Sequence, residues 1–290
     1  MKKKMKKTAG IIFMSALLLS GCGSTPAQQT GDNPAADGQN NQQEQEELTG
    51  KIAISGSTST EKIIKALADE YSALHPGVEI TYEGIGSSAG VKNAIDGVSD
   101  IGTASREIKE EEKSSGLTEN IFAYDGIAII VHPDNGVSDL TMDQIAAIYN
   151  GEITNWQEVG GQDGQIAVVS REEGSGTRSA FEELLGVEKI TQNADIAEGN
   201  GNVQTTVAGN PQAIGYVSFT YIDDTIKPVK VEGVQPNVED VLKGTYKLSR
   251  PFVMVYFDEQ ISDLTKNFIE FSRSDEGKAI VEEGGGIVEK

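Results

Sequence analysis

Segments with the two-residue period of β-strands alternate with segments of helical period from residue 51 onward, and this alternation restricts the fold more than any other feature. Residues 61–74 place apolar side chains at the three- and four-residue spacing of one buried helix face. Thr58-Ser59-Thr60-Glu61 has the pattern of a capping box, so this helix is expected to begin at Thr58. We also expect helices over 141–149 and 177–185, and strands over 51–55, 78–82, 100–104, 127–131 and 166–170. Strands and helices joined by short links predict an α/β fold with mainly parallel sheets.

The first 22 residues have the composition of an export signal. Five lysines precede an apolar stretch from Ala9 to Leu19, which is shorter than the ~20 residues that a membrane-spanning helix needs. Small residues then lead to Cys22, the only cysteine of the chain. This arrangement resembles a bacterial lipoprotein signal peptide, which implies removal of residues 1–21 and lipidation of Cys22. The alternative is an ordinary secretory signal with an incidental cysteine.

Residues 22–48 are interpreted as the lipidated Cys22 and a disordered tether. The tether consists mainly of small, polar and acidic residues, with no aromatic residue. Such a segment cannot bury enough apolar surface to offset the entropy lost on ordering. A flexible coil of this length would span roughly 25–30 Å. We therefore expect a domain that is held to the lipid bilayer of the cell membrane by a lipid anchor and faces outside the cytoplasm.

Charge and composition exclude several classes of protein. The chain has 24 Lys+Arg against 45 Asp+Glu and a formal charge of −21, and loss of five lysines with the signal would make it −26. Nucleic-acid binding depends on neutralising phosphates, so no nucleic-acid partner is expected. One cysteine and two distant histidines, His75 and His132, offer neither a disulfide framework nor an obvious metal site. No metal or cofactor is expected.

Four expected strands end in clusters of small or hydroxyl-bearing residues. These junctions are 55–60, 86–90, 102–106 and 171–177. In open α/β sheets, ligands bind beyond the carboxyl ends of the strands, and the helix N-termini there favour an anion. Arg106 and Arg171 stand beside such junctions, and a guanidinium can hold an oxyanion through two parallel hydrogen bonds. Each cluster alone is also what a simple helix cap looks like, but together they predict a site for a small tetrahedral oxyanion.

Five motifs in order make the chain resemble the phosphate-binding lipoproteins of bacterial phosphate ABC transporters, a class II family of periplasmic-type solute-binding proteins. The resemblance runs from about Lys51 to near the C-terminus. Its motifs are Gly84-Ile85-Gly86-Ser87-Ser88-Ala89-Gly90-Val91-Lys92, Asp100-Ile101-Gly102, Ile148-Tyr149-Asn150-Gly151-Glu152-Ile153-Thr154-Asn155-Trp156, Ala167-Val168-Val169-Ser170-Arg171 with Gly174-Ser175-Gly176-Thr177, and Ala213-Ile214-Gly215-Tyr216-Val217.

The resemblance implies a two-lobed periplasmic-binding-protein-like fold of type II. Each lobe would be a mainly parallel sheet flanked by helices, and the two lobes would be joined by two crossing strands. Residues 49–128 and 230–290 would form lobe I, and residues 129–229 would form lobe II. The strand near residues 123–131 would be the outward crossing, and a segment around residues 227–231 would be the return.

The resemblance also implies a set of phosphate ligands, carried over by position in the motifs. Thr58, Ser59 and Ser87 would donate from lobe I. From lobe II, Arg171 would be the charged clamp, and hydroxyl and backbone groups would donate from Ser175, Gly176 and Thr177.

The chain departs from the family at the third junction. Better-known members have an aspartate there that accepts the proton of phosphate and helps to exclude sulfate, whereas this chain has Ala104-Ser105-Arg106-Glu107. We include Ser105 and Arg106 among the candidate ligands. Arg106 either adds a second charge on the ligand or pairs with a nearby carboxylate.

The predicted function is a monomeric receptor that closes over inorganic phosphate and delivers it to the membrane subunits of a phosphate ABC transporter. The alternatives are a receptor for sulfate or molybdate and a surface interaction lipoprotein without a ligand. An enzyme is not expected. A serine hydrolase would need Ser175 or Ser88 as nucleophile, and no Gly-x-Ser-x-Gly elbow surrounds either residue. The phosphate-binding loops of nucleotide and dinucleotide enzymes are also missing.

Overall fold

The computed structural model describes residues 48–288, beginning with three strands that alternate with helices. The first elements are β1 (Thr49–Gly56), α1 (Glu61–Leu74), β2 (Gly77–Gly84), α2 (Ser87–Ile95), β3 (Ile101–Ala104) and α3 (Glu110–Lys113). β1 pairs in parallel with β2 on one side and with β3 on the other. The predicted apolar face of α1, which includes Ile63, Leu67 and Tyr71, is buried. The first predicted strands and helices are therefore confirmed.

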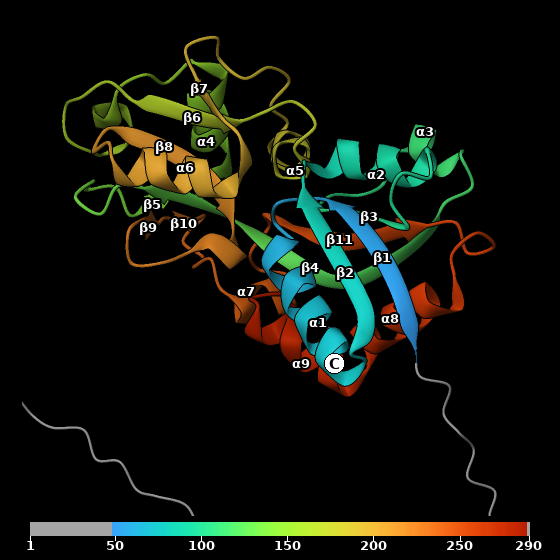
Figure 1. Ribbon diagram of the computed structural model, residues 1–290. Helices are drawn as coiled ribbons and strands as arrows, with labels where there is room; N and C mark the ends of the chain where they lie inside the picture. Colours follow the sequence, from blue (N-terminus) through green and yellow to red (C-terminus); the bar gives the residue numbers. More distant parts are fainter. Residues whose placement is uncertain (1–47, 289–290) are drawn as a thin grey trace, which may run out of the picture. The chain divides into compact units, whose positions relative to one another are not determined.

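β4 (Thr118–Val131) takes part in two separate sets of strand pairings. Its first part pairs antiparallel with β11 (Ser249–Tyr256), whereas Ile127–Val131 pairs antiparallel with β8 (Ala213–Ser218). We call β1, β2, β3, β11 and the start of β4 the first strand group. The end of β4 begins the second strand group, which continues with β8, β6 (Ala167–Arg171) and β7 (Asp195–Ala197). One long strand therefore connects the two groups (Figure 1).

The second strand group carries its own helices and short strands. They are β5 (Asp139–Leu140), α4 (Met142–Asn150), η1 (Trp156–Val159), α5 (Gly176–Leu185), α6 (Gly199–Ala208), η2 (Phe219–Tyr221), β9 (Lys227–Pro228), β10 (Lys230–Val231) and α7 (Val238–Leu242). α4 begins as predicted, because the Thr141 hydroxyl accepts from the backbone N–H of Gln144 at 3.1 Å. Gly151 ends α4 in the left-handed conformation, at φ 83°. The remaining helices, α8 (Asp263–Arg273) and α9 (Asp275–Glu283), follow β11.

The main sheet is mixed. Its strand order is β2-β1-β3-β11-β4-β8-β6-β7, with β9 paired to β4 off this path. The outer pairs on both sides are parallel, whereas β11 and β4 are antiparallel to their neighbours. The sequence led us to expect mainly parallel sheets, because the helical crossovers between outer strands are visible in the sequence pattern. The two central strands, β4 and β11, are more than 120 residues apart in the sequence, so no pattern of neighbouring residues predicts their pairing.

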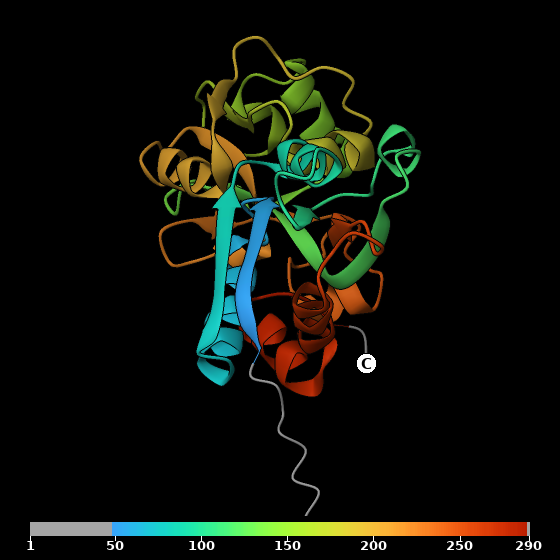
Figure 2. The same ribbon diagram turned by 45° about the vertical axis from the view of Figure 1, so that its right-hand side comes forward.

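Helices cover both faces of each strand group, as the two views show (Figure 1 and Figure 2). In the first group, α1, α8 and α9 share one apolar cluster with β1 and β11, and α2 packs on the opposite face. In the second group, α4 and α5 belong to one cluster and α6 to another. The end of β4 alternates between them, with Ile127 and Ile129 on the first face and Ala128 and Ile130 on the second.

The chain returns to the first strand group at β11. The segment expected to return, residues 227–231, instead forms β9 and β10, which pair with the end of β4 and with β5. Val231, Tyr246 and Leu248 pack in the apolar cluster of α4 and α5. Residues 230–248 therefore belong to the second strand group, because their apolar side chains are buried there.

The predicted signal peptide (1–21), Cys22 and all of the predicted tether except Leu48 lie outside the described residues. Within residues 48–288, no helix is long and apolar enough to cross a membrane.

Candidate anion-binding site

Thr58 and Ser59 follow the carboxyl end of β1, where two of the predicted donors were expected. The predicted helix start at Thr58 is wrong: α1 begins at Glu61, and its N-cap Thr60 makes no side-chain capping hydrogen bond. The hydroxyls of Thr58 and Ser59 instead each accept a hydrogen bond from Asn200 Nδ2, at 3.1 and 3.0 Å. Contacts with a distant helix therefore replace the local cap.

Three buried serines meet where β1 and β3 end and α2 begins. Ser57 Oγ donates to Ser105 Oγ at 2.8 Å, and Ser105 N donates to Ser87 Oγ at 3.1 Å. The Oγ atoms of Ser87 and Ser105 are 3.5 Å apart. Gly86 makes the turn into α2 with φ 92°, a conformation that side chains disfavour. Ser105, which belongs to the stretch 104–107 where the family resemblance implied an aspartate, therefore holds Ser87 in place.

The start of α5 presents donors from the second strand group. Ser175 is its N-cap: its Oγ accepts from Arg178 N at 3.2 Å, which leaves the hydroxyl proton available to a ligand. The N–H groups of Gly176 and Thr177 lie in the first turn, where a helix supplies no acceptor. They also lie at the positive end of the helix dipole, so this turn is suited to an anion.

The two strand groups meet at these donors. Ser59 Oγ and Thr177 Oγ1 are 3.0 Å apart and hydrogen-bonded. Gly176 lies so close to the start of α2 that a Cβ atom on it would be 2.1 Å from Ser87 Oγ. The first turns of α2 and α5 thus lie side by side (Figure 1). Ser59, Ser87 and Thr177 are almost completely buried.

Arg171 is the charged group of this cluster and is 1% exposed. Its Nε and Nη2 atoms hold the carboxylate of Glu172 at 2.8 and 2.7 Å, and Nη2 also donates to Thr58 Oγ1 at 3.3 Å. Its Nη1 atom has no hydrogen-bond partner within residues 48–288. Burial raises the pKa of Glu172, but the hydrogen bonds and charge of Arg171 outweigh burial and lower it. A buried guanidinium N–H without a partner is costly unless a ligand uses it.

A second buried arginine contacts the cluster through Ser59. Arg250 of β11 faces Asp125 of β4 directly in the antiparallel register. Its Nη2 and Nε atoms lie 2.8 and 3.2 Å from Asp125 Oδ2, and Nη2 donates to Ser59 Oγ at 3.1 Å. Arg250 Nη1 also has no partner in the described part of the chain. Burial raises the pKa of Asp125 and lowers that of Arg250, against the attraction between them.

Asn200, Asp125 and Arg250 were not among the predicted site residues. A signal for the last two was present, because a charged residue inside an apolar strand is rarely buried without a partner. Asn200 follows Gly199 at another junction between a strand and a helix, β7 and α6. That junction has no serine or threonine beside it, so it did not match the other four.

Arg106 is the predicted site residue that the structure does not bring into the cluster. Its Nη1 and Nη2 atoms hold Glu112 of α3 at 2.8 and 2.7 Å, and Nη2 also donates to Ser88 Oγ at 3.2 Å. Of the two roles open to Arg106, the structure has the pairing with a carboxylate. The other predicted residues, Thr58, Ser59, Ser87, Ser105, Arg171, Ser175, Gly176 and Thr177, lie together in the cluster.

A cavity of about 470 Å³ opens beside Thr58. Gly84, Ile85 and Gly86 line it from the first strand group, and Glu172, Glu198 and Gly199 from the second. We call it the acidic mouth, because two carboxylates stand in its wall next to the donor cluster.

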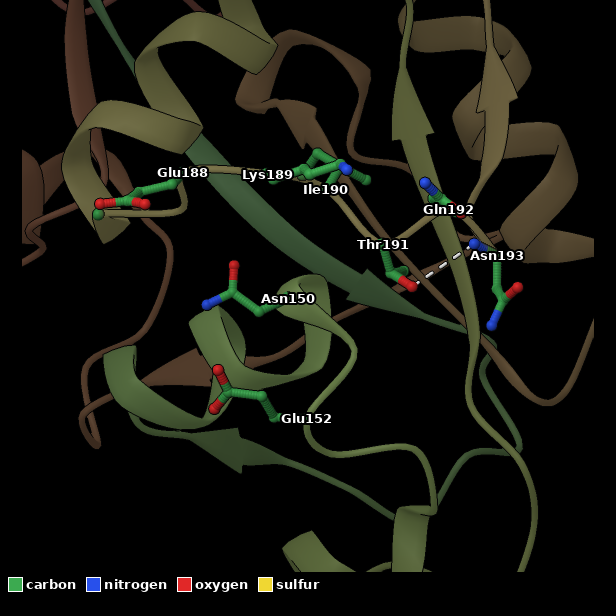
Figure 3. Close-up of a pocket in the computed structure, with 9 residues that line it drawn as sticks. Asn150, Glu152, Glu188, Lys189, Ile190, Thr191, Gln192 and Asn193 are labelled. Atoms are coloured by element: carbon green, nitrogen blue, oxygen red, sulfur yellow. Dashed lines mark hydrogen bonds between the residues drawn. The ribbon is translucent and has the colours of Figure 1, made fainter.

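A larger cavity of about 640 Å³ lies between the end of α4 and the segment after α5. Figure 3 shows that its side chains point in different directions and do not converge on one point. Glu152, Glu188 and Lys189 are exposed there. This cavity therefore lacks the buried, converging donors of the cluster at Arg171.

Within residues 48–288, no group of three or more His, Cys, Asp or Glu residues is placed to hold a metal ion.

Comparisons with known proteins agree on one family. A model of the PBP superfamily domain matches residues 33–276. The phosphate-binding protein PstS of Bacillus subtilis is 30% identical over 295 residues, which cover 98% of this chain and 94% of that protein.

Two solved structures are similar over 83% of this chain and 100% of their own chains. One is a candidate phosphate ABC transporter substrate-binding protein from Clostridium perfringens with bound phosphate, at 51% identity and a TM-score of 0.82. The other is an ABC-type phosphate transport receptor from Vibrio cholerae, at 38% identity and a TM-score of 0.72.

Proposed function

The chain belongs to the PstS family of phosphate-binding proteins within the PBP superfamily, and from this membership we propose that it binds inorganic phosphate for a phosphate-import ABC transporter. It is a binding protein and not an enzyme. The membrane subunits of that transporter are the proposed partners. Lipidation of Cys22 would keep the receptor at the membrane, outside the cytoplasm and within reach of them.

One observation carries the proposal: Arg171 Nη1 is buried without a partner within residues 48–288, on a guanidinium whose Nη2 atom contacts the Thr58 hydroxyl of the donor cluster. A phosphate oxygen placed there would accept from Arg171 and from the first-turn N–H groups of Gly176 and Thr177. Charge-assisted hydrogen bonds of this kind are about twice as strong as neutral ones. Ligand binding would thus remove the cost of the unpartnered guanidinium atom.

We assign the remaining ligands from the same cluster. Thr58, Ser59 and Ser87 would donate from the first strand group, and Ser175 and Thr177 from the second. Ser105 would act through Ser87, which it holds at hydrogen-bond distance. Arg106 is left out of the proposed ligands because it contacts no residue of the cluster: its Nη1 and Nη2 atoms hold Glu112, and Nη2 donates to Ser88 Oγ.

We further propose that the two strand groups are two lobes that close over the ligand. The first lobe would comprise residues 48–126 and 249–288, and the second residues 127–248. β4 and β11 would be the crossing strands. Donors from both groups surround one point, so a bound phosphate would stabilise the closed arrangement over the open one.

Sulfate is the second candidate ligand. Ser105, and not a carboxylate, follows the end of β3 at the cluster. A serine hydroxyl can accept a hydrogen bond from protonated phosphate but can equally donate one to sulfate, so it does not exclude sulfate as a carboxylate would. Molybdate belongs to the same alternative, because it is likewise a tetrahedral oxyanion.

Calorimetric titration of the full chain with phosphate, sulfate and molybdate tests the proposal. Tight phosphate binding and weak binding of the other two ions would support it. We expect Arg171→Ala to weaken phosphate binding by about 2–5 kcal/mol, because a buried charged partner is lost. Arg273→Ala, which removes the same charge from an exposed position of α8, should keep the wild-type affinity. Unchanged affinity in Arg171→Ala would overturn the site, and no phosphate binding by the wild type would overturn the function.

A further inference from the structure

Asn200 has an amide group whose orientation is fixed by the fold. Its Oδ1 atom accepts from the backbone N–H of Ser218 at 3.1 Å. A backbone N–H can only donate, so the oxygen of the amide must face Ser218. The Nδ2 atom therefore faces the hydroxyls of Thr58 and Ser59, at 3.1 and 3.0 Å. Asn200 is completely buried, at 0% exposure.

Each of these two hydroxyls also accepts from an arginine. Arg171 Nη2 donates to Thr58 Oγ1 at 3.3 Å, and Arg250 Nη2 donates to Ser59 Oγ at 3.1 Å. A hydroxyl group has two lone pairs and one proton. Since guanidinium and amide N–H groups cannot accept, both lone pairs of each hydroxyl are used. The two hydroxyl protons must therefore be donated elsewhere.

The proton of Ser59 has one protein acceptor within reach. Thr177 Oγ1 lies 3.0 Å from Ser59 Oγ, and it cannot donate in return because Ser59 has no lone pair left. Ser59 therefore donates either to Thr177 or to the ligand. In both cases the proton of Thr177 is directed away from Ser59.

We propose that Asn200 and Arg250 are positioning residues of the phosphate site: together with Arg171 they occupy the lone pairs of Thr58 and Ser59, so that these hydroxyls can only donate, to the ligand or, from Ser59, to Thr177. The proposal rests on the proposed function. Thr58 and Ser59 thus offer only donors and receive unprotonated phosphate oxygens. Neither residue needs to touch the ligand for this role.

The ion pair with Asp125 holds Arg250 where its Nη2 atom can donate to Ser59. The ion pair between β4 and β11 holds the guanidinium in place and balances its charge. Arg250 is 3% exposed and Asp125 is 0% exposed, so a single buried charge would be costly without the other. Arg250 thus contributes mainly through the direction of its hydrogen bond to Ser59, and less through net charge.

A donor-only surface favours the dianion of phosphate over the monoanion, because the monoanion carries one more proton that needs an acceptor. Affinity should rise with pH through the second ionisation of phosphate. The charged and titratable groups around Asn200, Thr58 and Ser59 are Arg171, Glu172, Glu198, Arg250, Asp125, Glu61, Tyr82 and Tyr221. None of them is a histidine, the side chain that ordinarily titrates near neutral pH, whereas phosphate loses its second proton in that range.

The test is Asn200→Asp, which keeps the shape of the side chain and turns two donors into acceptors. Its carboxylate can still accept from Ser218 N, so the fold is retained. We expect phosphate affinity, measured by calorimetry with the full chain, to fall on the order of 100-fold at about pH 8 and less at about pH 5.5. The rise of affinity with pH should disappear, because the hydroxyls can then donate to the new carboxylate and accept a hydrogen bond from the protonated oxygen of the ligand.

Asn202→Asp is the charge control. It adds the same charge on the same helix, in the wall of the acidic mouth, where the side chain contacts Glu198 O and not the hydroxyls. We expect it to weaken binding by no more than about threefold and to keep the pH dependence. Arg250→Lys is the second test, because lysine can pair with Asp125 without the fork that reaches Ser59. It should weaken binding by about tenfold and flatten the pH dependence.

The possible outcomes are distinct. If Asn200→Asp loses affinity equally at both pH values, its role is only structural and the inference is overturned. Wild-type behaviour of Arg250→Lys would remove Arg250 from the proposal. If the wild type does not bind phosphate at all, the proposed function fails and the inference fails with it.

Discussion

Gly176 lies where the two strand groups come closest. Its backbone is helical, so a side chain is excluded by its neighbours and not by its conformation. A Cβ atom there would be 2.1 Å from Ser87 Oγ and 2.8 Å from Ser105 Oγ. The absence of one methyl group thus allows the start of α5 to reach the serines of the first strand group.

We expect Gly176→Ala to weaken phosphate binding by about 10- to 100-fold, because a shift of about 1 Å misplaces the donors of α5. The free energy of unfolding should fall by about 1–3 kcal/mol from the overpacking. Gly136→Ala is the matched control, since no atom lies within 4 Å of a Cβ at that position. Titration calorimetry and chemical denaturation of both variants would measure the two effects. Wild-type affinity in Gly176→Ala would contradict the close approach of the two groups.

Glu112 illustrates a charged residue near the site whose task is stability. Burial raises its pKa, but hydrogen bonds from Arg106 and from the backbone of Lys109 outweigh burial and lower it. A carboxyl group with a lowered pKa stabilises the fold above its unfolded pKa of about 4.3, and this contribution is lost as the pH falls through the lower folded value.

Glu112→Gln should therefore lower the free energy of unfolding by about 1–3 kcal/mol at neutral pH. Denaturation as a function of pH should show a smaller loss of stability on the acid side than in the wild type. Phosphate affinity should be unchanged, because Arg106 is not among the proposed ligands. Glu111→Gln, an exposed neighbour, serves as control and should alter neither property. A loss of affinity in Glu112→Gln would return Arg106 to the site.

At the scale of elements, the first turn of α5 combines two tasks. The Ser175 hydroxyl caps the helix by accepting from Arg178 N, and its proton remains for a ligand. The helix cap uses a lone pair of the Ser175 hydroxyl oxygen, whereas a ligand would accept a hydrogen bond from the hydroxyl proton. One side chain can therefore serve both.

Ser175→Ala should lower the free energy of unfolding by about 1 kcal/mol through loss of the cap, and phosphate affinity by about tenfold through loss of the donor. Thr141→Ala removes the equivalent cap of α4, which is not part of the cluster. Thr141→Ala should lower the free energy of unfolding by the same amount as Ser175→Ala and leave the phosphate affinity unchanged. Equal phosphate affinity in both variants would show that Ser175 only caps the helix.

The predictable parts of the fold and the site were those encoded locally. The apolar face of α1, the cap at Thr141 and the hydroxyl clusters after the strands are all patterns of neighbouring residues, and the structure has them. Asn200 was missed because its partners, Thr58 and Ser59, lie more than 140 residues away. α6 also gave little helical signal, since only Val203 and Val207 form its buried apolar stripe.

The capping box at Thr58 failed for a related physical reason. A local cap contributes about 1 kcal/mol. The structure instead gives the Thr58 hydroxyl to Arg171 and Asn200. Tertiary contacts override a local signal of that size, so the motif placed the N-cap at Thr58, whereas the N-cap of α1 is Thr60.

At the scale of the whole molecule, β4 joins both strand groups and β11 completes the first. The return of the chain was expected near residues 227–231 and occurs at Ser249, because the intervening apolar residues, such as Tyr246, are buried in the second group. Sequence alone does not show which of two cores will bury a given valine or tyrosine. That choice depends on pairings across the full length of the chain.

The acidic mouth is expected to slow the association of phosphate with the protein. Glu172 and Glu198 stand in its wall, and the whole chain carries a formal charge of −21, the same sign as phosphate. Added salt should therefore accelerate phosphate association, opposite to the usual effect for oppositely charged partners. Rapid mixing with radiolabelled phosphate at increasing salt would measure this rate. Glu198→Gln should raise the rate at low salt and reduce its salt dependence, and a rate that falls with salt would contradict the expectation.

An ion that entered and left through the acidic mouth would pass Glu172 and Glu198 in both directions. Repulsion at the mouth then raises the barrier in both directions and leaves the equilibrium largely unaltered. The acidic mouth would therefore lengthen the residence time of a captured ion, so that release waits for an event that opens the two strand groups.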